Sequence, residues 1–125
     1  METRAFGNTD MRITPIGIGT FALGGEDWPV SWGPQDDNDS IATIQHAIDL
    51  GINWIDTAAV YGFGHSEEIV GQALKERAER PYVFTKCSRR PIQDGKIAGI
   101  LKAASIREEV EESLRRLQVD VRDAG

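Results

Sequence analysis

The chain has 125 residues, of which 40% are hydrophobic and 27% are charged, a composition typical of a globular domain rather than a fibrous or disordered protein. It contains no apolar run of 18 residues and no apolar stretch after its charged start, so we expect no membrane span, no secretory signal and a cytoplasmic location. Its net charge of −6 repels phosphates, which makes nucleic acid an unexpected partner.

Side chains that bind metals or form disulfides are scarce in the sequence. Cys87 is the single cysteine, so it forms no disulfide within the chain, and we interpret it as an ordinary reduced thiol. His46 and His65 have no companion at the spacing of a metal site or a catalytic triad. We therefore expect both histidines to be packed or solvated, and we expect no bound metal.

The first elements are predicted to be β-strands. Residues 3–6 and 11–14 are alternating runs separated by a Gly, Asn and Asp cluster, a pattern typical of a β-hairpin. Residues 16–21 form the predicted first core strand, whose glycines indicate the close approach of another backbone or a ligand. Residues 22–38 are rich in Gly and Pro, which predicts a long loop of the kind that often carries function.

Two helices and a strand are predicted next. A helix over residues 39–50 is indicated by an apolar stripe and by Gly51 just past its end; the stripe consists of Ile41, Ile44 and Ile48. Residues 52–56 have the pattern of a strand. A second amphipathic helix is predicted over residues 66–78, with Ser66 as its N-cap.

The last elements are predicted from residue 82 onward. Residues 82–86 form a predicted strand, and a polar loop then leads to a helix whose apolar positions are Ile106, Val110, Leu114 and Leu117. Residues 105–108 have the pattern of a capping box at its start. Glu112 and Arg116 are expected to pair on its solvated side. Residues 119–121 begin a predicted fourth strand.

Strands and helices alternate after the hairpin, which predicts an α/β fold built from parallel βαβ units. A doubly wound sheet and a (β/α)8 barrel both fit this order. Residues 15–118 hold three units of about 35 residues, and eight such units need ~277 residues, near the ~250 of a TIM barrel. Nucleotide-binding doubly wound sheets have a phosphate-binding loop after the first strand. Residues 17–22 lack the third glycine of the dinucleotide-binding motif. Gly25 and Glu26 stand where a P-loop has Lys and Ser or Thr.

We therefore predict that residues 1–125 form a single partial domain. It is the N-terminal part of a (β/α)8 TIM barrel, about three and a half βα units long, preceded by a short β-hairpin. A parallel sheet of three or four strands leaves both edges unpaired. We expect the chain to associate with itself or with a complementing C-terminal half-barrel.

Three residues at the ends of adjacent predicted strands suggest proton transfer. Asp56 and Lys86 end two neighbouring strands and Tyr61 lies in the loop after the first, so a parallel sheet places all three at one edge. A tyrosine with its free pKa of ~10 is a poor proton donor near neutral pH. A neighbouring ammonium lowers that pKa, and a carboxylate keeps the ammonium charged and oriented. A capping aspartate, a packed tyrosine and a solvated lysine also fit these positions.

Longer motifs surround these three residues. Residues 51–62 read GINWIDTAAVYG and residues 66–74 read SEEIVGQAL, and together they resemble the signature of the aldo/keto reductases. Residues 83–86, VFTK, look like the family's next strand with its lysine. Residues 4–20 look like its opening hairpin and first strand. The resemblance covers residues 3–121.

The resemblance implies the NADPH-dependent reduction of a small aldehyde or ketone, with NADH as the alternative cofactor. It implies that Tyr61 protonates the carbonyl oxygen and that Lys86 and Asp56 tune Tyr61. The residues that it places near the nicotinamide end of the cofactor are Gly19, Thr20 and Asp56. The residues that it places in the wall of the substrate cleft are Trp28, Trp32 and Tyr61.

The sequence departs from the family pattern near its end. In the family the fourth strand leads to a histidine that completes a catalytic tetrad, whereas residues 119–125 contain no histidine, and neither His46 nor His65 occupies that place. We therefore expect a truncated reductase that is weakly active or inactive alone. The alternatives from other classes are a non-catalytic module that associates through its sheet edge and a doubly wound domain that binds a small ligand.

Overall fold

The computed structural model describes residues 1–119, and at its centre is a three-stranded parallel sheet. The strands are β3 (Ile18–Gly19), β4 (Trp54–Asp56) and β5 (Tyr82–Phe84), in the order β3-β4-β5. The register pairs Gly19 with Asp56, and β5 continues the sheet in the same direction. The predicted parallel strands are confirmed, and their carboxyl ends lie side by side.

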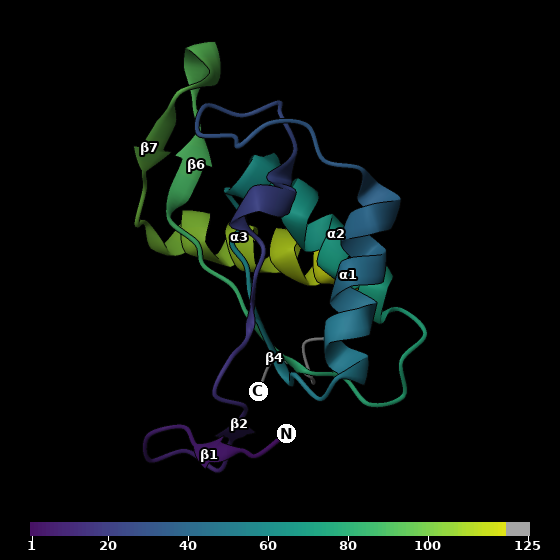
Figure 1. Cartoon of the computed structure of the whole chain (residues 1–125). Helices are drawn as coiled ribbons and strands as arrows, with labels where there is room; N and C mark the ends of the chain where they lie inside the picture. The colour runs from purple at the N-terminus through teal and green to yellow at the C-terminus, as the bar shows by residue number, and fades with distance from the viewer. Residues whose placement is uncertain (120–125) are drawn as a thin grey trace.

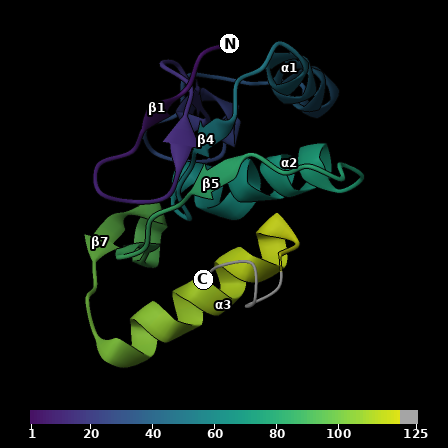
Figure 2. The ribbon, with the colours of Figure 1, turned by 90° about the horizontal axis from the view of Figure 1, so that it is seen from below.

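Three helices pack beside one another against this sheet, with α2 between α1 and α3 (Figure 1, Figure 2). They are α1 (Asp37–Asp49), α2 (His65–Leu74) and α3 (Ala103–Leu117). Almost fully buried aliphatic side chains form the core between the helices and the sheet: Ile44, Ile55, Ile69, Val70, Ala73, Leu74 and Leu117. The predicted alternation of strand and helix is confirmed.

The chain opens with the predicted hairpin, in which β1 (Arg4–Ala5) and β2 (Arg12–Ile13) pair antiparallel. It lies at the amino end of the sheet, below the strands in Figure 1. Asn53, at the start of the second core strand, donates from Nδ2 to the carbonyl oxygen of Arg12 at 2.8 Å. The hairpin is therefore attached to the sheet through a side chain that lies far from it in the sequence.

Two helices begin earlier than predicted, α1 by two residues and α3 by three. At the start of α1, the carboxylate of Asp36 accepts the N–H of Asp39 at 3.0 Å and caps the helix. In α3 the predicted capping box over residues 105–108 is wrong, because Ser105 lies in the first turn and its hydroxyl accepts the N–H of Lys102 at 3.2 Å. In both helices a side chain in or next to the first turn accepts a backbone N–H at the helix start.

The boundaries of α2 also differ from the prediction. The chain turns through three residues of positive φ, Gly62, Phe63 and Gly64, and the helix begins directly after them at His65. Ser66, the predicted N-cap, therefore lies inside the helix, where its buried hydroxyl donates to the carbonyl oxygen of Thr20 at 2.9 Å. The helix ends at Leu74 rather than at Ala78.

The region after β5, predicted as a polar loop, contains a second hairpin. β6 (Arg89–Pro91) pairs antiparallel with β7 (Ile97–Gly99), and Asp94 in the connecting turn has a φ of 62°. The sequence gives little sign of this hairpin, because its first strand consists of two arginines and a proline. It lies at the opposite end of the molecule from β1 and β2 (Figure 1).

Of the predicted apolar stripe of α3, Leu117 is confirmed as a core residue, whereas the middle of the stripe turns away from the core. The buried residues of α3 are Glu109, Ser113 and Leu117. Val110 of the predicted stripe is 45% exposed. Arg116 lies 3.9 Å from its predicted partner Glu112 but donates to the buried Glu67 of α2 at 2.7 Å. The ion pair of Arg116 and Glu67 therefore joins α3 to α2 beside the apolar contact of Leu117.

None of the helices within residues 1–119 has the length and hydropathy of a membrane-crossing segment. Of the predicted fourth strand, Val119 belongs to the part of the chain that the structure describes. Residues 120–125 contain the rest of that strand and lie outside the described residues.

Gly71 lies at the contact of α2 with the end of α3, and this gives a test of the packing. A Cβ at this position would lie 2.3 Å from the carbonyl oxygen of Arg116 and 3.2 Å from the backbone of Leu117. We expect Gly71→Ala to lower the free energy of unfolding by about 1–3 kcal/mol, because the helices must separate to admit the methyl group.

Urea unfolding of the chain followed by circular dichroism measures this change. Gln72→Ala, at an exposed position of the same helix, is the matched control and is expected to change the free energy of unfolding by less than about 0.5 kcal/mol. Equal stability of Gly71→Ala and the parent chain would contradict the close packing of the two helices.

Candidate active site

The carboxyl ends of β4 and β5 bring three of the predicted site residues together. Lys86 follows β5, and its Nζ donates to Oδ1 of Asp56 at 2.8 Å and to the hydroxyl oxygen of Tyr61 at 3.4 Å. It also donates to the carbonyl oxygen of Thr57 at 2.8 Å. Sequence reasoning missed the contact with Thr57, because a backbone oxygen carries no residue-type signal.

Backbone hydrogen bonds hold the segments that carry these side chains. The N–H of Thr57 donates to the carbonyl oxygen of Phe84 at 2.8 Å, and the N–H of Ala59 donates to that of Lys86 at 3.2 Å. The chain after β4 therefore runs along the end of β5 before it turns at Tyr61. This parallel course places the carboxylate, the ammonium and the phenol within one small volume.

The environment of Lys86 keeps its ammonium group protonated. Partial burial lowers the pKa of Lys86. The hydrogen bonds with Asp56 and Tyr61 and the charges of these groups together raise it by more than burial lowers it, so the pKa lies above its ordinary value of 10.5. At neutral pH a positive charge therefore lies 3.4 Å from the Tyr61 hydroxyl oxygen. Such a charge stabilises negative charge that develops on the phenol oxygen.

Aromatic rings from the loop after β3 surround Tyr61. Phe21 lies 5.2 Å from the Tyr61 ring and Trp28 lies 6.0 Å from it, measured between ring centroids. Trp28 is 6% exposed and acts mainly in packing, whereas Trp32 is 79% exposed and contacts Phe21 at 5.6 Å. Of the two tryptophans predicted for the substrate wall, Trp32 therefore offers the free surface.

Sequence reasoning missed Phe21, which contacts both tryptophans and Tyr61. Its place directly after the first core strand was the available signal, because the carboxyl ends of parallel strands share one edge with the predicted site. These rings form one aromatic cluster in which Phe21 is the central ring.

Two glycines allow the loops after β3 and β4 to touch. A Cβ on Gly62 would lie 2.1 Å from the carbonyl oxygen of Gly24, and a Cβ on Gly24 would lie 2.7 Å from the amide nitrogen of Gly62. Any larger residue at either position would push the loops apart. This backbone contact therefore holds Tyr61 against the aromatic cluster.

Two of the residues predicted near a cofactor, Gly19 and Thr20, lie at the carboxyl end of β3 and differ in exposure. Gly19 is exposed, and a Cβ there would meet nothing within 4 Å, so open space lies beside Asp56. Thr20 is buried, and its N–H and hydroxyl both donate to the carbonyl oxygen of Asp56, at 3.0 and 3.2 Å. Its carbonyl oxygen accepts from Ser66. Thr20 therefore joins β3 to β4 and α2, and its predicted place near the nicotinamide stays a prediction.

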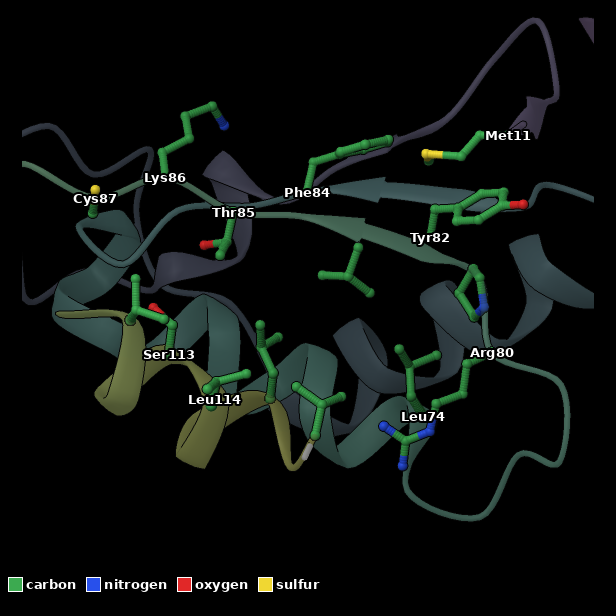
Figure 3. Close-up of a pocket in the computed structure, with 15 residues that line it drawn as sticks. Met11, Leu74, Arg80, Tyr82, Phe84, Thr85, Lys86, Cys87, Ser113 and Leu114 are labelled. Atoms are coloured by element: carbon green, nitrogen blue, oxygen red, sulfur yellow. The ribbon is translucent and has the colours of Figure 1, made fainter. Parts of the chain in front are cut away.

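A groove of about 560 Å³ runs between β5 and α3 (Figure 3). Apolar side chains line much of it, including Val83, Val110 and Leu114. Lys86 points away from the groove and Thr85 points toward α3 (Figure 3). Among residues 1–119, β5 pairs with β4 alone, so the groove follows a strand edge that carries unpaired backbone groups.

The two histidines lie apart from these residues. His46 is exposed on α1, and Nε2 of His65 lies 2.7 Å from Oδ1 of Asp37. Within residues 1–119, no group of three or more His, Cys, Asp and Glu side chains is arranged to hold a metal ion.

The parallel βα units, with a carboxylate, a phenol and an ammonium at their carboxyl ends, define the N-terminal part of a (β/α)8 barrel. A sequence model described as the Aldo/keto reductase family matches residues 15–124, and the chain belongs to this family.

Relatives and solved structures agree with this assignment. Aldo-keto reductase YhdN of Bacillus subtilis (strain 168) is 44% identical over 126 residues, which cover 98% of this chain and 36% of the relative. NADH-specific methylglyoxal reductase of Escherichia coli (strain K12) is 41% identical over 133 residues, which cover 98% of this chain and 40% of the relative. The chain therefore spans about 36–40% of the length of these relatives.

Two solved structures show the same fold. The glycerol dehydrogenase from Gluconobacter oxydans superposes with a TM-score of 0.79 at 42% identity, covering 94% of this chain and 36% of that protein. An aldo-keto reductase from Klebsiella pneumoniae in complex with NADPH superposes with a TM-score of 0.69 at 28% identity, covering 95% and 36%. The predicted partial barrel is confirmed as the fold of the matched region.

The raised pKa of Lys86 gives a test of the site that needs no catalytic activity. Asp56→Asn removes a negative charge beside Lys86, so we expect the pKa of Lys86 to fall relative to the parent chain. A pH titration of 13C-labelled lysine by NMR measures it, with the signal assigned by its loss in Lys86→Arg.

The matched control is Asp49→Asn, which removes a carboxylate that pairs with Arg77 elsewhere. The pKa of Lys86 is raised on folding, so its contribution to stability is complete below the unfolded-state pKa and is lost as the pH rises through the folded-state pKa. An unchanged pKa of Lys86 in Asp56→Asn would contradict the hydrogen bond between the two side chains.

Proposed function

We propose that this chain supplies the proton-donor side of an NAD(P)H-dependent reductase that converts a small aldehyde or ketone to an alcohol. The observation that carries the proposal is the position of Lys86 Nζ, 2.8 Å from Asp56 Oδ1 and 3.4 Å from the Tyr61 hydroxyl oxygen. A phenol next to a fixed ammonium can release its proton to a substrate oxygen and leave a stabilised negative charge behind.

Each of the three side chains has one role in this mechanism. Tyr61 donates its hydroxyl proton to the carbonyl oxygen as that oxygen becomes negative. Lys86 stabilises the phenolate that remains, and Asp56 keeps Lys86 charged and oriented, together with the carbonyl oxygen of Thr57. Half of the Lys86 side-chain surface is exposed, so water can return the proton to Tyr61 afterwards.

The carboxyl ends of β3 and β4 fit the nicotinamide end of a cofactor. The empty space where Gly19 would carry a Cβ leaves room for a flat ring, and the Asp56 carboxylate, 39% exposed, can accept a hydrogen bond from an amide group. When bound, the nicotinamide supplies the two electrons and the hydrogen that reach the carbonyl carbon. We assign Gly19 and Asp56 to contact with the cofactor, and Thr20 to holding Asp56 in place.

The cofactor in this proposal is NADPH, with NADH as the alternative. The Klebsiella pneumoniae structure in complex with NADPH supports the first, and the Escherichia coli relative named as NADH-specific supports the second. In (β/α)8 barrels the phosphates are frequently bound by the loops after strands 7 and 8. Residues 1–119 therefore offer contacts to the nicotinamide end and not to the phosphates.

The aromatic cluster supports a substrate with an apolar group beside its carbonyl. Trp32 exposes most of its ring near Tyr61, and Phe21 connects the two by edge contacts. Apolar walls with few polar groups are typical of small-molecule sites. We therefore propose Trp32 and Tyr61 as substrate contacts, and Trp28 as the buried side chain that supports them.

A chimera tests the proton-donor role. Residues 1–119 replace the matched N-terminal part of the Escherichia coli methylglyoxal reductase, and methylglyoxal-dependent oxidation of NADH is assayed. We expect Tyr61→Phe to lower kcat by ~10²–10⁴, because general acid catalysis is lost. Lys86→Met is expected to cost a similar order, because the phenol then donates without a neighbouring ammonium and with a free pKa of ~10.

The matched control is Lys96→Met, an exposed lysine next to β7, which is expected to keep the kcat of the parent chimera. A Tyr61→Phe chimera with the parent's kcat would contradict the mechanism. The 125-residue chain without the added segment is expected to be weakly active or inactive, because positioning of the cofactor supplies much of the rate.

A second candidate function is self-association without catalysis, and the groove along β5 favours it. The exposed edge of β5 offers backbone groups that another strand can pair with. Two copies related by a twofold axis would bring their β5 edges together antiparallel and would cover Val110 and Leu114 of both copies. The same groove is the surface that a complementing C-terminal half-barrel would cover.

The state of association of the chain tests this candidate. Sedimentation velocity at rising concentration is expected to show dimers, and Val110→Lys is expected to shift the chain toward monomer, because a charge then enters the apolar groove. Val30→Lys, at a similarly exposed position in the long loop, is the control. A Val110→Lys chain that associates as the parent does would exclude the groove as the surface of association. A chimera that is monomeric and active would favour the reductase function over self-association.

A further inference from the structure

Two buried carboxyl groups, which the proposed mechanism does not use, hold the segment that carries Lys86. Glu67 on α2 is 0% exposed and Glu109 on α3 is 2% exposed. Both bond to residues of the segment 85–88, which leaves the sheet at the end of β5. The position of the Lys86 ammonium depends on the path of this short segment.

Glu67 holds the residue before Lys86. Its Oε1 accepts the hydroxyl of Thr85 at 2.5 Å, and its Oε2 accepts Nε of Arg116 at 2.7 Å. Neighbouring side chains of an extended segment point to opposite sides. The bond that fixes Thr85 toward the helices therefore directs Lys86 away from them, as Figure 3 shows.

Glu109 holds the residue two positions after Lys86. Both of its carboxylate oxygens lie 3.1 Å from the amide nitrogen of Ser88, which donates to them. Ser88 has a φ of 88°, a conformation that L residues rarely adopt, and its carbonyl oxygen accepts the N–H of Ile100 at 2.7 Å. Such a conformation persists only where surrounding contacts enforce it. Glu109 provides one of these contacts.

Stability alone does not explain the choice of Glu109. Within the described residues this buried carboxylate accepts one backbone N–H, and the charge of Arg90 also acts on it. An aliphatic side chain of similar size could be buried there without any such partner. The position lies on the face of α3 that packs inward, where leucine would be the ordinary residue. What the carboxylate adds is the fixed turn at Ser88.

We propose that Glu67 and Glu109 are positioning residues that fix the segment 85–88 from both ends and thereby set the distance between Lys86 Nζ and the Tyr61 hydroxyl. The geometric part is independent of activity, and the consequence for catalysis rests on the proposed reductase function. Each carboxylate acts through the backbone on either side of Lys86, and neither contacts the reacting atoms.

The variants are chosen to release one end of the segment at a time. Thr85→Val removes the hydroxyl that bonds Glu67 with little change of shape, and it leaves the buried pair of Glu67 and Arg116 intact. Glu109→Leu removes the acceptor for the N–H of Ser88, whereas Glu109→Gln keeps an acceptor oxygen. Glu111→Gln, an exposed position on α3, is the control.

The first readout is the pKa of Lys86 in the 125-residue chain, measured by NMR titration of labelled lysine. Thr85→Val and Glu109→Leu are expected to lower this pKa, because Lys86 moves away from the groups that raise it, and Glu109→Gln is expected to restore it. Thr85→Val is conservative enough to test the inference even if Glu109→Leu does not fold. An unchanged pKa of Lys86 in both Thr85→Val and Glu109→Leu would overturn the inference.

The second readout is the kinetics of the chimera. Thr85→Val and Glu109→Leu are expected to lower kcat by ~10–10² with KM changed less than about twofold, because a displacement near 1 Å at a catalytic group has effects of this size. A parent-like kcat in both would overturn the catalytic part of the inference. A lowered pKa together with full activity of Tyr61→Phe would instead reject the proposed function and keep the positioning roles.

Discussion

The buried carboxylate of Glu67 is the interaction on which the arrangement of helices and site depends. A carboxylate without solvent must find charged or hydrogen-bonding partners, since its desolvation is otherwise strongly unfavourable. Its two partners, Thr85 and Arg116, come from the end of β5 and from α3. Glu67 therefore joins three elements at one point, and their relative positions cannot change without leaving a buried charge unpaired.

The close packing around Arg116 follows from this bond. A Cβ on Gly64 would lie 2.9 Å from Cδ of Arg116, and one on Gly71 would lie 2.3 Å from its carbonyl oxygen. Glycines just before α2 and within it let α3 approach closely enough for Arg116 to reach Glu67. The same approach turns the apolar stripe of α3 partly toward the groove along β5, which is why Val110 is exposed while Glu109 is buried.

The chemistry of the site lies at the opposite side of β5 from this ion pair. Thr85 and Lys86 are neighbours in the chain, and one bonds to the buried carboxylate while the other reaches Asp56 and Tyr61. Packing beneath the sheet and the cluster of Asp56, Tyr61 and Lys86 above it are thus connected through two adjacent residues. This connection supports the ammonium of Lys86 at a fixed place beside loops that contain many glycines.

The sequence by itself determined the order and direction of the core elements, and with them the meeting of Asp56 and Lys86. Helical periodicity located the helices, and parallel strands place their carboxyl ends together whatever the details of packing. The motif around Tyr61 indicated the family before any geometry was known. These features depend on local pattern or topology, which neighbouring residues encode.

Only the tertiary structure decided the roles of Ser66, Thr20, Glu67, Glu109 and Arg116, and the second hairpin at β6 and β7. In the sequence, each of these polar side chains is equally compatible with a cap, a ligand contact or a surface charge. The residue type is the same whether the side chain is exposed or is buried against a partner. Its role is set by a partner far away in the chain, such as Thr85 for Glu67 or Ser88 for Glu109. A buried polar group is favourable only when that partner is in place, and folding alone brings the two together.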